Sequence, residues 1–473
     1  MFNRFNKASY LEVEASYAKT SPVKEICVFG VAGKKRANGA DVLWAIVRPD
    51  LEYFKEYNEV NLRAVLKERF DNTSQTLPYD KRIEGFTITL DALPHTFYGK
   101  IKRDRVLKLY QPKVIAERAG IPTEEAVMSK EDVLLVTSST GKMVLDCLQK
   151  QSGTDRAIAP SDSLELDLGV DSLGRIELAT CLEVAFNVDI KNEDISRVFT
   201  VEDLIFEIEN VIKRAKGMPF EDRDIALGPD YWKDLLQVPP KEMTMEMLEL
   251  GTGYFAWLFR FILTGIDLLF MKIFFRIKEK GAKNVPKQGA FIIYGNHTSF
   301  LDGPAIGACL PRRRVFQLFY FVFGPYFFRP FVRSRTLRNL VKMGRFIPFD
   351  YSTHFLEALR SSYYVLAQGK GLCFFPEGLR SSTGEVLEFK KGFGVLAKES
   401  GALLVPVAIK GAFEAWPSTA QYPKHHPINV IFGEPLNVQD LEKEGLAMGA
   451  KDGYEAICIA ARKKLIALKS DPY

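Results

Sequence analysis

The sequence of 473 residues predicts a multidomain α/β protein. Three observations support this fold class: alternating strand patterns near the N-terminus, apolar residues at helical spacing in an acidic central segment, and apolar runs that end in polar turns in the C-terminal half. The length suits two to four domains. We expect domains over residues 1–115, 139–215 and 246–473, with a linker over 216–245.

Residues 1–115 contain two predicted strands, 25–30 and 41–47, and the segment 93–103 carries Lys100. This arrangement resembles the small C-terminal α+β subdomain of acyl-adenylating enzymes, the AMP-dependent ligases. The resemblance implies that Lys100 contacts the acyl-adenylate, where a positive charge neutralises phosphate charge that develops during adenylation. A solvated surface lysine is the alternative interpretation.

The large adenylate-forming domain of these ligases has no counterpart in the chain, since no phosphate loop rich in Gly, Ser and Thr precedes this region. We therefore expect that the chain does not activate a fatty acid alone. Either a separate adenylate-forming chain is a partner, or the reading frame is truncated.

The central segment is acidic, since residues 161–210 contain thirteen Asp or Glu and three Lys or Arg. Within it, Asp171 and Ser172 open a predicted helix. The apolar residues at helical spacing behind them are Leu173, Ile176, Ala179 and Leu182. We expect the serine to be exposed, as a modifying enzyme requires. An N-capping serine is the alternative interpretation.

The block 166–178 around this serine resembles acyl carrier proteins, which are four-helix bundles. The resemblance implies that Ser172 carries 4′-phosphopantetheine, attached by a phosphopantetheinyl transferase, and that the thiol of this arm holds an acyl chain as a thioester. The linker 216–245 is rich in Pro and Gly and is expected to be a spacer rather than a core element. A tether raises the effective concentration of the acyl group at a neighbouring domain.

His297 and Asp302 follow the apolar run 290–294. A histidine can accept a proton from a hydroxyl near neutral pH, and a carboxylate can orient it. On one continuous helix two residues five apart would lie about 140° apart around the axis, so the chain must turn for them to pair. We expect that turn at a strand-to-helix junction, where α/β folds place catalytic groups. A satisfied surface pair is the alternative.

A second apolar strand leads into a turn that carries Glu377, Gly378 and Arg380. A turn glycine lets the backbone approach a ligand closely, and an arginine offers a planar fork for phosphate or carboxylate. Further apolar blocks lie at 345–351 and 402–409. Along the chain the four blocks are 290–302, 345–351, 372–381 and 402–409. Together they resemble the glycerolipid acyltransferase family of the lysophosphatidate type, over about residues 250–440.

This second resemblance implies an α/β acyltransferase domain with a general base acting on an acceptor hydroxyl. His297 is that base, and Asp302 orients it. Glu377, Gly378 and Arg380 help to bind the acceptor head group. The activated alcohol attacks a thioester carbonyl, so no covalent acyl-enzyme is needed.

The expected reaction moves a fatty acyl group from a thioester, carrier-bound or on coenzyme A, to a lysophospholipid, most simply 1-acyl-glycerol-3-phosphate, in phospholipid synthesis. Two positions depart from the family pattern: Tyr351 replaces an arginine and Leu379 a threonine. Tyr351 leaves open a different alcohol acceptor. A non-catalytic carrier scaffold that works with a separate acyl-adenylating chain is the other alternative.

The segment 254–275 approaches membrane-spanning length but contains Arg260, Asp267 and Lys272, which are costly inside a bilayer. We expect it to lie in the membrane interface, with a buried core helix as the alternative. From 316 to 331, nine of sixteen residues are Phe or Tyr. The arginines around them are Arg312, Arg313, Arg314, Arg329, Arg333, Arg335 and Arg338. We favour a lipid surface over nucleic acid as the partner of this patch.

Six cysteines without paired spacing argue against a disulfide framework and against a zinc site, and no metal is expected. The N-terminus lacks the apolar core of a secretion signal. We therefore expect a cytoplasmic protein that is peripherally associated with the inner face of the membrane.

Overall fold

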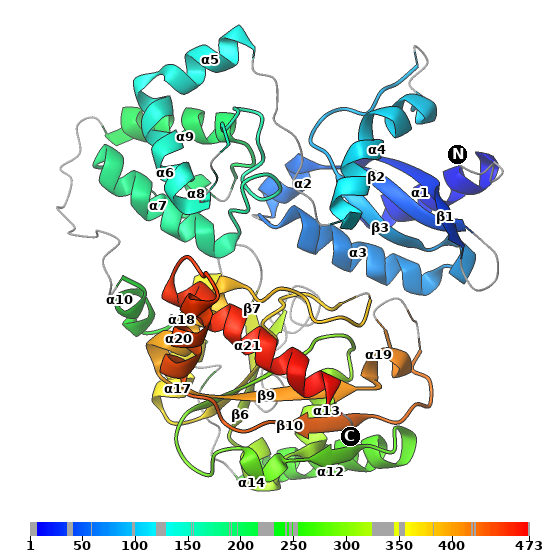
Figure 1. Ribbon diagram of the computed structural model, residues 1–473, viewed down its shortest axis with the longest axis vertical. Coiled ribbons are helices and arrows are strands. Elements are labelled where there is room, and N and C mark those ends of the chain that lie inside the picture. Colours follow the sequence, from blue (N-terminus) through cyan, green and yellow to red (C-terminus); the bar gives the residue numbers. More distant parts are fainter. Residues whose placement is uncertain are drawn as a thin grey trace. The chain divides into compact units, whose positions relative to one another are not determined.

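The computed structural model describes residues 7–471, apart from 36–40, 58, 97–99, 120–128, 153, 155, 189, 191, 196, 216–230, 242–243, 246–247, 249–253, 324–344, 350–354, 382, 418–419 and 421. The chain divides into two compact units (Figure 1). Unit 1 covers Met1–Leu227, and unit 2 covers Gly228–Asp350 and His354–Tyr473. Unit 1 therefore contains both of the first two predicted domains.

The N-terminal part of unit 1 is a small α+β fold. Its elements are α1 (Lys7–Thr20), β1 (Val23–Lys35), β2 (Asp41–Pro49), α2 (Leu51–Glu56), α3 (Leu62–Thr76), η1 (Tyr79–Lys81), β3 (Ile83–Ile88) and α4 (Arg103–Ala119). The sheet has the order β1-β2-β3, with β1 antiparallel and β3 parallel to β2. Both predicted strands are present in β1 and β2.

The second part of unit 1 is helical, as predicted. Its helices are α5 (Lys130–Thr137), α6 (Ser139–Ser152), α7 (Ser172–Phe186), α8 (Asn192–Ile195) and α9 (Val201–Ala215). Residues of α6, α7 and α9 share one core, with Leu148, Leu178 and Leu204 all fully buried. The helical spacing seen in the sequence thus places one face of α7 in that core.

Unit 2 is an α/β domain. Its helices are α10 (Tyr231–Gln237), α12 (Tyr254–Phe274), η2 (Ala282–Asn284), α13 (Asp302–Cys309), α14 (Arg312–Val315), α17 (Phe355–Ala367), α18 (Lys391–Ser400), α19 (Ala412–Ala415), α20 (Val438–Ala447) and α21 (Gly453–Ser470). Its strands are β4 (Lys278–Lys280), β5 (Phe291–Gly295), β6 (Leu318–Phe323), β7 (Phe346–Phe349), β8 (Gly371–Phe374), β9 (Leu403–Lys410) and β10 (Asn429–Phe432).

The seven-stranded sheet of unit 2 has the order β4-β10-β9-β5-β8-β6-β7. β5 is central, fully buried, and parallel to both β8 and β9. Phe291 and Ile293 belong to the core that α12 and α13 complete on one side of the sheet. On the other side, Tyr294 donates its hydroxyl to a carbonyl of α21 and packs against Phe393 of α18 (Figure 1). Helices on both faces explain why β5 is a continuous apolar run.

Part of the predicted linker is structured. Of residues 216–245, positions 231–237 form α10, whose Trp232 and Leu236 are 3% and 1% exposed. The Arg360 side chain of α17 donates to the Leu235 carbonyl at 2.8 Å. The prediction of a spacer is therefore wrong for α10, because its two apolar side chains find partners in unit 2. Pro219, Gly228 and Pro229 lie outside the described residues.

The first part of the aromatic patch, residues 318–323, is not the surface patch that was predicted. Residues 318–323 form β6, in which Phe319 and Phe321 are buried. Arg314 is buried as well, with its guanidinium over the Phe291 ring. Aromatic residues fit a half-buried pleated surface, so here they build the sheet rather than a surface patch. The rest of the patch, 324–344, lies outside the described residues.

Helix α12 presents two faces. Met271 is fully buried in the core, whereas Trp257, Ile266, Leu269 and Ile273 are 47%, 60%, 60% and 68% exposed. One face of α12 therefore packs against the core, while the opposite face exposes apolar side chains. Among the helices of the described residues, none is long and apolar enough to cross a membrane.

Candidate active site and carrier serine

The loops after β5 and β8 lie side by side, because the two strands are parallel neighbours with Tyr294 opposite Phe374. Their carboxyl ends therefore open at the same edge of the sheet. Buried Asn296 ties the first loop to β9: its side chain donates to the Ile409 carbonyl at 2.9 Å and accepts the Ile409 N–H at 2.8 Å. These two hydrogen bonds to the neighbouring strand fix the position from which the next residue, His297, leaves β5.

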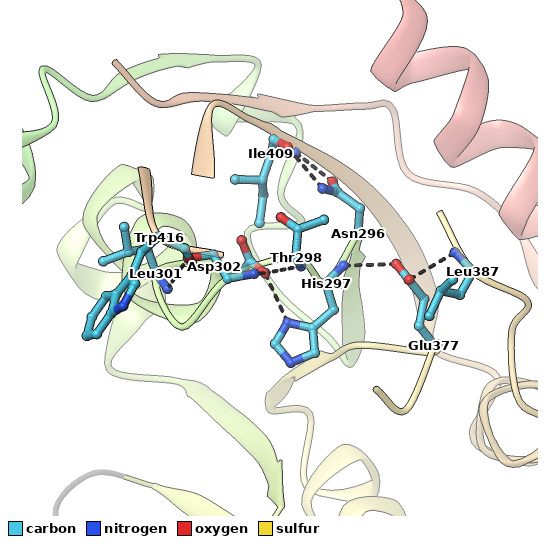
Figure 2. Close-up of polar contacts among 10 residues, drawn as sticks. Asn296, His297, Thr298, Leu301, Asp302, Glu377, Leu387, Ile409 and Trp416 are labelled. Atoms are coloured by element: carbon cyan, nitrogen blue, oxygen red, sulfur yellow. Dashed lines mark hydrogen bonds and ion pairs between the residues drawn. The ribbon is translucent and has the colours of Figure 1, made fainter. Parts of the chain in front are cut away.

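His297 and Asp302 pair across this turn (Figure 2). Nδ1 of His297 lies 2.9 Å from Oδ2 of Asp302. Asp302 begins α13, is fully buried, and also accepts the N–H groups of Thr298 and Ser299 at 2.6 and 2.8 Å. Three donors hold the carboxylate, so the carboxylate in turn fixes the imidazole with its proton on Nδ1. The predicted strand-to-helix turn and the predicted pairing are both present.

The imidazole ring is fixed on a second side. It stacks on Phe375, with ring centroids 4.3 Å apart and an interplanar angle of 15°. The His297 side chain nevertheless remains 24% exposed. Because Nδ1 donates to Asp302, Nε2 is the ring nitrogen left to accept a proton. The arrangement suits an oriented general base, and that role stays a prediction.

Glu377 lies next to the main chain of His297. Its side chain is 2% exposed, and its two carboxylate oxygens accept the N–H groups of His297 and Leu387, each at 2.9 Å (Figure 2). Burial raises its pKa to about 7, although the two backbone hydrogen bonds favour the ionised form. Both oxygens are thus engaged by the protein. Glu377 therefore supports the main chain of His297, and its contact with an acceptor head group stays a prediction.

Gly378 and Arg380 follow on the same turn, half-buried. Gly378 has a φ of 71°, which favours glycine. The Arg380 guanidinium lies 3.6 Å from the centroid of the Phe300 ring, and Phe300 is 41% exposed. The next residue, Ser381, donates its N–H to the His297 carbonyl at 2.7 Å. A cation therefore lies beside the base-bearing loop, and its contact with an acceptor stays a prediction.

Ser172 is the first residue of α7. The helix is capped by Asp171, whose carboxylate accepts the N–H groups of Leu173 and Gly174, so the capping-serine interpretation is wrong. Ser172 is only 9% exposed, and its Oγ accepts a hydrogen bond from Nδ2 of Asn61 at 2.7 Å. The expectation of an exposed serine is therefore also wrong, because a side chain of the N-terminal part covers the hydroxyl.

The remaining predicted positions lie elsewhere. Lys100 is exposed, and its main chain exchanges hydrogen bonds with Thr96. Tyr351 lies outside the described residues. Within the described part of the chain, no group of His, Cys, Asp and Glu is arranged to hold a metal ion.

Three residues of these sites were not predicted. Asn296 precedes His297 at the end of an apolar run, and Phe375 precedes the Pro-Glu-Gly turn, so both had a positional signal in the sequence. Asn61 had none, because it meets Ser172 from 111 positions away.

Comparison with known proteins finds a family model for each of the two segments that contain these residues. Residues 143–205 match the family model described as phosphopantetheine attachment site. An acyl carrier protein of Syntrophobacter fumaroxidans is 40% identical over 62 residues, which cover 13% of this chain and 76% of that protein. Through this segment the chain belongs to the acyl carrier protein family. The predicted covalent 4′-phosphopantetheine of the carrier domain is thereby confirmed, and Ser172 as its attachment point stays a prediction.

Residues 276–410 match the family model described as acyltransferase, and this range contains every predicted residue of the transfer site. The 1-acyl-sn-glycerol-3-phosphate acyltransferase LPAT1 of Arabidopsis thaliana, a chloroplast protein, is 27% identical over 194 residues, 41% of this chain and 49% of that protein. The carrier-containing chain thus spans about half the length of this curated relative. The solved 1-acyl-sn-glycerophosphate acyltransferase PlsC of Thermotoga maritima is 19% identical with a TM-score of 0.35, over 51% of this chain and 96% of that one. An acyltransferase domain beside the carrier domain is as predicted.

Proposed function

We propose that the chain is an O-acyltransferase of the 1-acylglycerol-3-phosphate acyltransferase type, which moves a fatty acyl group from a thioester to a lipid hydroxyl. The observation that supports this most strongly is the pair of His297 and Asp302 at the edge of a parallel sheet, inside the segment that matches the acyltransferase model. An oriented imidazole that remains partly exposed suits a reaction in which a bound alcohol must lose a proton.

In the proposed reaction, Nε2 of His297 takes the proton of the acceptor hydroxyl as its oxygen attacks the thioester carbonyl. Asp302 stabilises the imidazolium through the hydrogen bond at Nδ1. When the carbon–sulfur bond breaks, the imidazolium returns the proton to the leaving thiolate. Both steps use one base, and no acyl group is attached to the protein at this site.

The proposed acceptor is a lysophospholipid, most simply 1-acyl-glycerol-3-phosphate, with Gly378 and Arg380 beside its head group. The names of the curated relatives support this acceptor. Arginine matches phosphate in charge and geometry. The proposed donor is a thioester on the carrier domain or on coenzyme A, and phospholipid synthesis is the pathway that such a product serves.

The carrier domain places a phosphopantetheinyl transferase among the partners, with Ser172 as the proposed target. The N-terminal part is proposed to be the small subdomain of an acyl-adenylating enzyme, in which Lys100 contacts the adenylate once a separate adenylate-forming domain completes it. Its exposed position is compatible with such a partner.

The exposed apolar face of α12 supports peripheral attachment at the inner face of the membrane. Residues such as Leu269 and Ile273 would enter the interface between head groups and acyl chains, while Met271 stays in the protein core. The acceptor and the product are lipids, so attachment there brings the site to its substrate.

A panel of acceptors with a radiolabelled acyl thioester tests the proposal. We expect label on 1-acyl-glycerol-3-phosphate and on no water-soluble alcohol. Transfer to another lipid alcohol instead would favour the second function that Tyr351 motivates. Absence of transfer to every acceptor would favour the non-catalytic scaffold.

A further inference from the structure

The contact between Asn61 and Ser172 joins the two parts of unit 1 at the residue proposed for modification. Both side chains are buried, at 7% and 9% exposed. Asn61 precedes α3 but makes no side-chain capping bond to that helix. Its amide donates to Ser172 Oγ instead, at 2.7 Å. The side chain that could have capped α3 is thus used to hold the carrier serine.

A second polar contact stands next to the first. The carboxylate of Glu165, in the carrier, accepts the N–H of Leu62 at 2.6 Å and the N–H of Arg63 at 3.3 Å. These N–H groups belong to the first turn of α3, where no helix carbonyl can accept them and where a negative charge is favoured. Adjacent residues, Asn61 and Leu62, therefore hold two separate points of the carrier.

Apolar packing completes the contact. Phe199 of the carrier is 1% exposed and belongs to the core of the N-terminal part, with Leu166 packed against the same core. Its ring meets that of Phe54 edge-on, with centroids 6.3 Å apart. A fully buried aromatic at the centre and polar bonds beside it are the features of a specific docking surface.

Modification of the serine cannot occur in this arrangement. In the reaction Ser172 Oγ loses its proton and bonds to the phosphorus that carries the pantetheine arm. The pyrophosphate P–O bond of coenzyme A breaks, and adenosine 3′,5′-bisphosphate leaves as the proton is released. A covered hydroxyl cannot reach that phosphorus. The phosphodiester formed would also place a negative charge at a position where the hydroxyl it replaces is buried.

We propose that the N-terminal part is a docking partner for the unmodified carrier, and that it competes with the phosphopantetheinyl transferase for the face around Ser172. Attachment of the arm then releases the carrier from α3. The inference rests on the proposed function only in taking Ser172 as the attachment residue. It gives the N-terminal part a role that needs no adenylation chemistry.

The test is the rate at which the unmodified full-length chain takes up phosphopantetheine from coenzyme A and a phosphopantetheinyl transferase, followed by intact mass. Loss of one hydrogen bond predicts that Asn61→Ala is modified about fivefold faster. Glu165→Gln should act in the same direction. Asn72→Ala, the same change near the other end of α3, should leave the rate unchanged. An Asn61→Ala rate equal to or below that of the wild type would overturn the inference.

Hydrogen exchange gives a second readout that does not depend on a variant. The amides of Leu62 and Arg63 should exchange faster after modification, and unchanged protection there would contradict release.

The Ser172→Ala variant separates this inference from the proposed function. If that variant still gains the mass of the arm, the attachment residue is elsewhere, and the assignment of Ser172 fails together with the masking role. If it gains none, the site stands and the rates decide on docking.

Discussion

The transfer site and the carrier serine hold their reactive groups in opposite ways. His297 is fixed by Asp302 and Phe375 within one sheet edge and remains 24% exposed. Ser172 is 9% exposed and is covered by a side chain from another part of its unit. In its proposed role as a base, His297 must keep one orientation and remain accessible at every turnover. In its proposed role as attachment residue, Ser172 reacts only once, so it can be buried until it exchanges Asn61 for the modifying enzyme.

The largest expected effect comes from the orienting carboxylate. Asp302→Asn keeps the volume but turns an amide toward Nδ1, which favours the wrong tautomer of His297. We expect acyl transfer to fall by about 10³-fold, while uptake of phosphopantetheine at the carrier is unchanged. Measured kcat for both reactions checks this, with the exposed Asp440→Asn on α20 as the control. Equal loss of both reactions would mean that the substitution unfolds the chain.

A smaller effect is expected at the residue behind the base. Glu377→Gln leaves one of two backbone N–H groups without its acceptor, so the His297 loop shifts and transfer falls about tenfold. A change confined to KM would contradict a positioning role and would support the predicted contact of Glu377 with the acceptor.

The same variant tests the ionisation of Glu377. Burial raises its pKa in the folded chain to about 7, above the ordinary value of 4.5. The folded state therefore favours the protonated carboxyl, whose contribution to stability is fully present below pH 4.5 and is lost as the pH rises to about 7. The free energy of unfolding of the wild type, minus that of Glu377→Gln, should fall by on the order of 3 kcal/mol as the pH rises across this window. A difference that does not change with pH would contradict it.

The smallest expected effect concerns the lipid surface. Leu269→Lys places a charge on the exposed face of α12 and should weaken binding to anionic vesicles about fivefold. Leu446→Lys, at a 47% exposed position on α20, is the matched control. Flotation at low salt measures both. Wild-type protein that stays wholly in the soluble fraction would exclude the membrane role of α12.

Sequence patterns predicted the surroundings of His297 better than those of Ser172, for a physical reason. His297 and Glu377 follow neighbouring parallel strands, and strand ends converge by the geometry of a sheet. Their meeting was thus implied by two local patterns. The contact of Asn61 with Ser172 depends on how two separately folded parts pack, and no local pattern encodes that.

The aromatic segment and the linker show the same limit. Phe319 and Phe321 could equally have formed a surface patch or a strand, and only the presence of β7 and β8 on either side decides for the strand. Trp232 lies among residues that read as a spacer, and its burial depends on the partner surface of unit 2. Burial is a property of the assembled fold, so composition alone did not reveal it.

The most direct test of the account is transfer from the chain's own carrier. The phosphopantetheine arm is loaded with a radiolabelled acyl group, 1-acyl-glycerol-3-phosphate is added, and label in the lipid is followed in single-turnover conditions. The account predicts rapid transfer by the wild type and by His426→Ala, and a loss of about 10³-fold in His297→Ala. Transfer by His297→Ala at the wild-type rate would contradict it.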